Sequence, residues 1–299
     1  MKKIVFFIVI ALGISCKEEH KKEIPLLNNE NDLEAVANML DTQAEMENSG
    51  FEIKNLLGSY VGMFVADDFK YGEKASFQNK INITIDSLTN QTIYGHSIVA
   101  GNSRPFEGTI NLETLKASVK EPGDDKYDGV FEFTISNNEK SLEGTWLAND
   151  KKLKVTKRKY ILSKMIFKYN PSFNLEKDDS FDFQILTDNY DEKIEGAMEL
   201  ESIDGDIIAE LNASVDKLEN TDIENLNKGE LEVVRNMIYA RHGYSFKNRK
   251  MRYFFDEMDW YIPVSTDVRD QLTEIELKNI DLLKRYEQHA EAYYDYFGR

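Results

Sequence analysis

Apolar and polar residues alternate along the middle of the chain, between residues 51 and 169. Ile81, Ile83 and Ile85 are separated by polar residues, and this period of two is typical of a strand with one buried face. Asn137-Asn138 is a turn signal ahead of another such segment. Further strands are expected at residues 60–64, 92–99, 106–110, 116–120, 130–135, 141–147 and 153–163. About eight short strands at even spacing predict an antiparallel β-barrel or sandwich.

The predicted barrel has two candidate interiors. Gly58-Ser59-Tyr60 near its start and Gly144-Thr145-Trp146 near its end are loosely similar to calycin-type barrels. A closed barrel of about eight strands is wide enough to hold one small apolar ligand, and a carrier function would need a continuous apolar cavity of at least ~300 Å3. The favoured alternative is a barrel filled by its own Phe and Tyr side chains, because the sequence alone does not separate inward from outward residues.

A helical period replaces the alternation after residue 222. Asn227 and Glu230 are three residues apart, which is the spacing of a helix capping box. The apolar residues that then recur on one helix face are Leu231, Val234 and Ile238. Gly243 is expected to end this helix, since glycine adopts the left-handed conformation without a Cβ clash.

Two more helices are predicted downstream. Residues 248–255 have the pattern of a short helix, followed by an aromatic turn. Thr273 and Glu276 repeat the capping-box spacing, and the last helix runs from there to about residue 294. The expected fold class is α+β, with an antiparallel barrel at residues 51–169 and a small all-α domain at residues 222–299.

The first of these helices ends in a recognisable motif. The run Tyr239-Ala240-Arg241-His242-Gly243 resembles the signature of the YARHG domain. Arg235-Asn236 ahead of it and Trp260-Tyr261 downstream stand where that family has them. The resemblance covers residues 222–287. It implies an extracellular bacterial module with a binding role, and it supplies no reaction.

The helical domain holds the candidate binding residues. These are Tyr239, Arg241, His242, Lys250, Trp260 and Tyr261. The alternative is a structural role, because cations such as Arg241 in the last turn of a helix complement its dipole. A catalytic histidine needs a nucleophile or an orienting carboxylate, and none stands near His242 in the sequence. We expect no catalytic residue, no cofactor and no metal site.

The N-terminus has the features of an export signal. Lys2 and Lys3 precede an uncharged apolar run at residues 4–14, which is shorter than the ~20 residues of a transmembrane helix. Cys16 follows this run and is the one cysteine of the chain. The arrangement resembles the acceptor site of bacterial lipoprotein signals. It predicts removal of residues 1–15 as a signal peptide and lipid on Cys16.

The segment after Cys16 adds to the expected location. Residues 16–50 are polar and acidic, and we expect them to form a flexible tether. Lys17-Glu18-Glu19 resembles the tether with which Bacteroidota direct lipoproteins to the outer surface. The expected location is therefore the cell envelope, with the lipid inserted in the outer membrane. Whether the protein faces the cell surface or the periplasm is left open.

Charge narrows the choice of partners. The formal net charge is −17, and a nucleic-acid backbone would repel such a chain. Residues 170–221 are rich in Asp and Glu, and we expect an acidic linker between the two domains.

These patterns favour a lipid-anchored envelope protein that binds and does not catalyse. Its expected partners are the membrane, through lipid on Cys16, and a cell-wall polymer or another envelope protein. A lipid or small-molecule carrier acting through the barrel is the second hypothesis. A hydrolase that uses His242 is the third.

Overall fold

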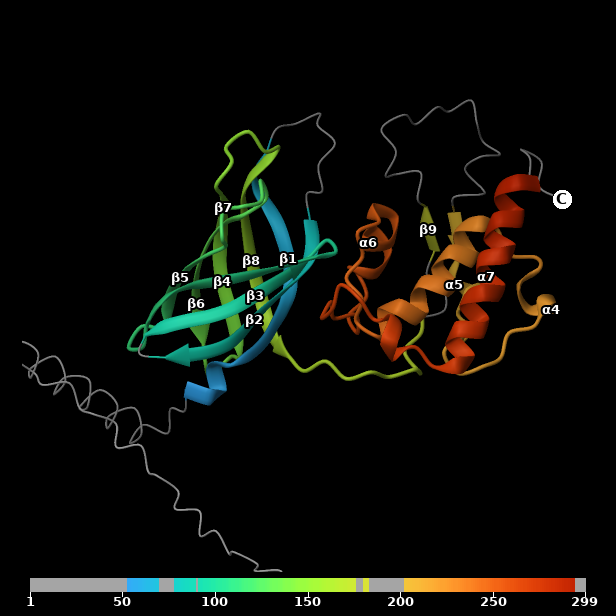
Figure 1. Cartoon of the computed structure of the whole chain (residues 1–299), viewed down its shortest axis with the longest axis horizontal. Helices are drawn as coiled ribbons and strands as arrows, with labels where there is room; N and C mark the ends of the chain where they lie inside the picture. Colours follow the sequence, from blue (N-terminus) through green and yellow to red (C-terminus); the bar gives the residue numbers. More distant parts are fainter. Residues whose placement is uncertain (1–52, 70–77, 90, 176–179, 183–201, 294–299) are drawn as a thin grey trace, which may run out of the picture. The chain divides into compact units, whose positions relative to one another are not determined.

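The computed structural model describes residues 53–69, 78–89, 91–175, 180–182 and 202–293. The predicted signal peptide, Cys16 and the tether lie outside these residues. Eight strands form a closed antiparallel barrel in which each strand pairs with the next and β8 pairs with β1 (Figure 1). The strands are β1 (Gly58–Phe69), β2 (Gln78–Thr89), β3 (Thr92–Val99), β4 (Asn102–Asn111), β5 (Lys116–Lys120), β6 (Gly129–Ser136), β7 (Ser141–Ala148) and β8 (Val155–Met165). The predicted antiparallel barrel is confirmed.

The alternation in the sequence corresponds to the two faces of the barrel wall. Ile81, Ile83 and Ile85 of β2 are at most 1% exposed and belong to the barrel core. A tight turn connects β3 to β4. Ala100 and Gly101 join β3 to β4 with φ angles of 50° and 73°, the left-handed conformation that matches the twist of paired antiparallel strands.

A short 3-10 helix, η1 (Ile53–Leu56), lies at one end of the barrel (Figure 1). Leu56 is buried, and the hydroxyl of Tyr60 donates a hydrogen bond to its carbonyl oxygen at 3.0 Å. Leu142 and Leu162, which are paired across β7 and β8, fill the interior near this end. The barrel is therefore filled by its own side chains here, as the favoured alternative predicted, although its other end is hollow.

The C-terminal region is helical, as predicted. Its elements are the two-stranded sheet of β9 (Ser180–Asp182) and β10 (Ser202–Asp204), and α3 (Gly205–Ile208), α4 (Asn220–Ile223), α5 (Lys228–Arg241), α6 (Arg249–Phe255), η3 (Arg269–Gln271) and α7 (Glu274–Tyr293). Helices α5 and α7 lie side by side (Figure 1), and Leu231, Ile238 and Leu283 contribute to the core of this domain. No helix in the described part of the chain is long and apolar enough to span a membrane.

Both predicted capping boxes are present. The side chain of Asn227 accepts a hydrogen bond from the backbone nitrogen of Glu230 at 2.9 Å, and the Glu230 carboxylate accepts one from Asn227 at 2.8 Å. Thr273 and Glu276 form the equivalent pair at 3.3 and 2.8 Å. Gly243 follows α5 with a φ of 73°. Local signals therefore determine where α5 and α7 begin and where α5 ends.

Part of the segment predicted as an acidic linker packs into the helical domain. Its buried apolar side chains are Leu175, Ile203, Ile208, Ala213 and Leu218. These residues are scattered among acids, so they produce no helix or strand period in the sequence. They nevertheless belong to the core that α5 and α7 enclose.

The outer surface of β2 contacts the region around α6 through hydrogen bonds. The backbone nitrogen of Lys80 donates to Asp256 Oδ2 at 2.8 Å, and the side-chain amide of Asn82 donates to the carbonyl oxygen of Pro263 at 2.9 Å. Asn82 and Asp256 are both buried. Water is therefore excluded from these hydrogen bonds, and they hold the region around α6 against the outer surface of β2.

Candidate ligand-binding site

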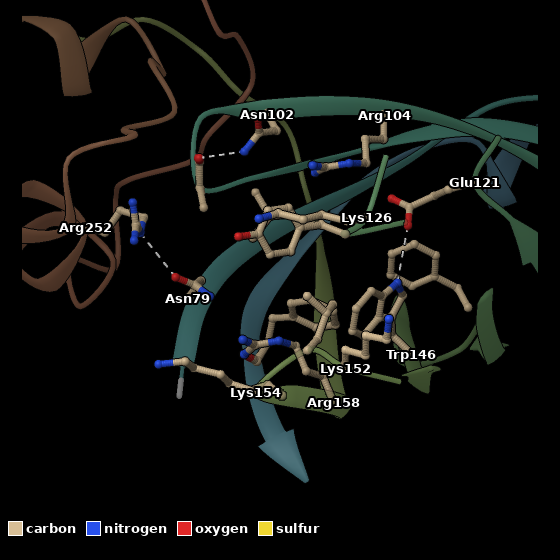
Figure 2. A pocket seen from close by; sticks show the side chains of 17 residues that line it. Asn79, Asn102, Arg104, Glu121, Lys126, Trp146, Lys152, Lys154, Arg158 and Arg252 are labelled. Atoms are coloured by element: carbon tan, nitrogen blue, oxygen red, sulfur yellow. Dashed lines mark hydrogen bonds between the residues drawn. The ribbon is translucent and has the colours of Figure 1, made fainter. Parts of the chain in front are cut away.

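The hollow end of the barrel contains a cavity of about 610 Å3 (Figure 2). It lies at the end opposite η1, where Val99 ends β3, Asn102 begins β4 and Val155 begins β8. Side chains from residues 121–127 and 152–154, which connect strands at this end, also line it. A cavity of this size is in the range that holds a small organic molecule.

Three aromatic side chains line the cavity from inside the barrel, and we refer to Phe64, Phe131 and Trp146 as the aromatic floor. Their ring centroids are 6.2 Å apart for Phe64 and Phe131, and 5.7 Å apart for Phe64 and Trp146. All three are buried. Aromatic groups at these separations form a stable cluster, so the floor offers a preformed apolar surface.

The rest of the lining is strongly cationic. The positively charged side chains are Arg104, Lys126, Lys152, Lys154, Arg158 and Arg252 (Figure 2). Among the described residues that line the cavity, Glu121 is the one acid. The whole chain has a formal net charge of −17. The positive charge of the cavity is therefore a local feature and does not follow from composition.

Arg158 brings one of these charges close to the aromatic floor. It lies on β8 with the same parity as the buried Tyr160 and Leu162. Its guanidinium donates a hydrogen bond to the carbonyl oxygen of Phe64 at 3.0 Å and lies 5.0 Å from the centroid of the Phe64 ring. Burial lowers the pKa of Arg158 to about 10, so the group stays charged at neutral pH. An anion in the cavity would compensate for hydration that this cation has lost.

Arg104 of β4 is paired with acids of the barrel. Its Nε atom lies 3.0 Å from Asp128 Oδ1, and its Nη2 atom lies 3.4 Å from Asp125 Oδ1. The other carboxylate oxygen of Asp128 accepts a hydrogen bond from the backbone nitrogen of Gly123 at 2.8 Å. Arg104 therefore helps to order the loop between β5 and β6.

Glu121 orients part of the aromatic floor. Its carboxyl oxygens accept hydrogen bonds from Ser97 Oγ at 3.0 Å, from the backbone nitrogen of Gly129 at 2.8 Å and from Trp146 Nε1 at 3.3 Å. Burial raises the pKa of Glu121 despite these donors. The hydrogen bond to Glu121 thus fixes the orientation of the Trp146 indole.

Arg252 of α6 is the cavity residue that the helical domain contributes. Its Nε atom donates a hydrogen bond to Asn79 Oδ1 on β2 at 3.2 Å (Figure 2). Its Nη1 atom donates to the carbonyl oxygens of Phe246 and Lys247. Burial lowers the pKa of Arg252. The guanidinium is therefore fixed at the cavity by bonds to both domains.

The residues predicted from the signature motif lie elsewhere. Arg241 is 1% exposed. Its Nε atom donates to the carbonyl oxygen of Phe173 at 2.6 Å, and its other nitrogens bond to Ser214 Oγ at 3.1 Å and to Asn174 Oδ1 at 3.4 Å. All these contacts are internal to the helical domain.

His242 has a carboxylate partner, but in a buried position. Its Nε2 atom lies 2.9 Å from Glu276 Oε2, and its ring stacks on Tyr169 with centroids 4.3 Å apart. Burial raises the pKa of Glu276, but hydrogen bonds from His242 and Thr273 outweigh it and lower the value to about 2. Because the imidazole is 4% exposed, a substrate has no access to it in this structure.

The other four predicted residues are divided between interior and surface. Tyr261 is buried, whereas Tyr239, Lys250 and Trp260 are half-buried. The Trp260 ring stacks on Phe173 at 5.3 Å. The structure thus gathers the aromatic residues into packing contacts and leaves Lys250 on a separate helix. That these residues bind a partner stays a prediction.

Sequence analysis did not identify the cavity residues, although a signal for two of them was present. Arg104 and Arg158 each stand two residues before a buried aromatic residue, Phe106 and Tyr160. In a strand this spacing places both side chains on the same face. An arginine on the inner face of a filled barrel would be costly, so the pair points to a polar interior. Recognising this spacing as a signal requires the register of each strand.

Comparison with known proteins bears on the C-terminal region. No curated protein is detectably similar to the chain. The family model of the YARHG domain matches residues 206–288, which include α5 and α6 and most of α7. This match confirms the resemblance carried by the run from Tyr239 to Gly243. The C-terminal region of the chain is therefore a YARHG domain.

Proposed function

We propose that this chain is a non-enzymatic binding protein of the bacterial cell envelope whose barrel cavity holds a small organic ligand. The observation that carries the proposal is a cavity of about 610 Å3 with an aromatic floor. Ligand sites are typically cavities of this size, with an apolar surface and a few polar groups. The cavity is not apolar throughout, so it differs from the lumen that the carrier hypothesis required.

The location in the envelope rests on the N-terminal sequence. An export signal ending at Cys16 supports secretion and a lipid anchor. The YARHG resemblance also implies an extracellular module. A binding protein at this location would meet its ligand outside the cytoplasm.

A neutral fluorescent probe tests the cavity directly. Phenylnaphthylamine, whose emission rises in apolar surroundings, is titrated into the full chain carrying Cys16→Ser, which removes the lipid acceptor. We expect saturable binding. Val99→Phe places a large ring in the cavity, because Val99 lines it, and is expected to weaken binding at least about tenfold, or about 1.4 kcal/mol.

Leu147→Phe is the matched control. Leu147 is next to Trp146 on the opposite face of β7 and is exposed, so this change adds a ring outside the barrel. We expect it to leave probe binding unchanged. Thermal melting of each protein verifies folding. Equal binding by all three folded proteins would contradict a ligand site in the cavity.

A further inference from the structure

We propose that the ligand is an organic anion with an apolar body, held by a cationic lining to which Arg158 of the barrel and Arg252 of the YARHG domain both contribute. This inference rests on the proposed function and adds the chemical class of the ligand. It also makes the site one that two domains build together.

The charge of the lining is the first support. Six cationic side chains and one acid, Glu121, line the cavity. Glu121 already accepts three hydrogen bonds from the barrel, and Arg104 is paired with Asp125 and Asp128. Lys126, Lys152, Lys154, Arg158 and Arg252 add five further positive charges to the lining. Such a concentration of one sign in a partly enclosed space attracts the opposite sign.

The position of Arg158 supports an anion bound deep in the cavity. Its guanidinium lies over the ring of Phe64, a residue of the aromatic floor. The planar guanidinium group offers paired donors that match a carboxylate or a sulfonate. A ligand whose charged group meets Arg158 therefore has its apolar part next to the aromatic floor.

The aromatic floor excludes a purely inorganic anion as the best fit. Phosphate or sulfate would satisfy the cations and leave Phe64, Phe131 and Trp146 uncovered. An amphiphilic anion covers both surfaces, and burying its apolar part is favourable in proportion to the area removed from water.

Arg252 connects the ligand to the YARHG domain. It lines the same cavity while it is bonded to Asn79 of β2 and to the backbone after α5. A bound anion near this guanidinium would contact groups of both domains. Its binding would therefore stabilise the contact between β2 and α6 by mass action.

Two probes of similar shape test the charge requirement. Anilinonaphthalene sulfonate is anionic and phenylnaphthylamine is neutral, and both are titrated into the full chain carrying Cys16→Ser. We expect the anionic probe to bind at least about tenfold more tightly. Arg158→Gln and Arg252→Gln are each expected to weaken the anionic probe several-fold and to change the neutral one less than about twofold. Arg158→Lys, which keeps the charge but not the planar paired donors, is expected to recover only part of the anionic binding.

Matched controls separate these effects from surface charge. Lys159→Gln removes a cation from the exposed face of β8, next to Arg158, and Arg249→Gln removes one from the exposed start of α6. We expect both variants to bind the anionic probe like the parent. Competition then defines the class: decanoate should displace the probe, and inorganic phosphate should not.

The outcomes distinguish the two proposals. Tight binding of the neutral probe with no preference for the anionic one would overturn the anion inference and leave the proposed function intact. Equal losses for both probes in Arg158→Gln would show that Arg158 is structural and would also overturn it. If Arg252→Gln bound the anionic probe as tightly as the parent, the YARHG domain would not contribute to the site. Displacement of the probe by phosphate and not by decanoate would contradict the inference that the ligand is amphiphilic. Failure of both probes would overturn the proposed function itself.

Discussion

Arg241 belongs to the family signature, and its role in this structure is to form hydrogen bonds inside its own domain. Its guanidinium is bonded to Phe173, Asn174 and Ser214, which belong to segments that precede the signature in the sequence. Burial lowers the pKa of Arg241 to about 10, so it is charged at neutral pH. The residue therefore ties the end of α5 to the segments around residues 173 and 214.

Replacing this side chain is expected to destabilise the domain. Arg241→Ala removes the donors and leaves buried acceptors without them, so we expect the free energy of unfolding to fall by about 3 kcal/mol. Denaturation by urea measures the change. Arg249→Ala, at an exposed position of α6, serves as the control and is expected to change stability by less than about 0.5 kcal/mol. Similar small losses in both variants would argue against a structural role for Arg241.

Between elements, the contact of α6 with β2 contains a titratable group. Asp256 follows the last turn of α6 and accepts a hydrogen bond from the backbone of Lys80. Burial raises the pKa of Asp256 to about 7, even though the Lys80 hydrogen bond and the charges of Lys80 and Arg252 lower it; the charge of Glu257 raises it further. The contact is therefore most favourable when Asp256 is protonated.

This raised pKa predicts a pH dependence of stability. An unfolded aspartate has a pKa of 3.8, so between that value and about 7 the folded chain keeps a proton that the unfolded chain releases. The stabilisation is present at acidic pH and is lost as the pH rises through this window. Relative to Asp256→Asn, the parent should lose on the order of 2 kcal/mol of stability between about pH 5 and pH 8.

Denaturation at the two pH values measures this difference. Asp267→Asn provides the control, because hydrogen bonds from Arg269 lower the pKa of the exposed Asp267 to about 2, and its titration is complete below pH 5. We expect no pH-dependent difference for that variant. A constant difference between the parent and Asp256→Asn at both pH values would show that Asp256 does not titrate in this range.

For the whole molecule, the decisive feature is the predicted anchor at Cys16. Acyl chains on this residue would bury many methylene groups in the bilayer, at about 0.8 kcal/mol each. When the chain is produced in a bacterial host, Cys16→Ser should move the protein from the membrane fraction to the soluble fraction. Ser15→Ala keeps the cysteine and should leave the distribution unchanged. Continued membrane association of the Cys16→Ser protein would contradict lipid anchoring through this residue.

Much of the local structure was predictable because it depends on neighbours in the sequence. The alternation around Ile83 follows from the period of two in a strand, and the start of α5 follows from a capping box of Asn227 and Glu230. The run ending at Gly243 was enough to identify the YARHG domain. Each of these signals is complete within a few residues or a single motif.

Tertiary structure decided which residues share the cavity. Arg104, Trp146 and Arg158 line one cavity because the barrel closes through the pairing of β1 with β8 and because each strand has one register. A shift by one residue would turn Arg158 to the outside. Arg252 joins them from the YARHG domain. Such contacts link residues far apart in the sequence, so they exist only once the chain has folded, and no local pattern contains them.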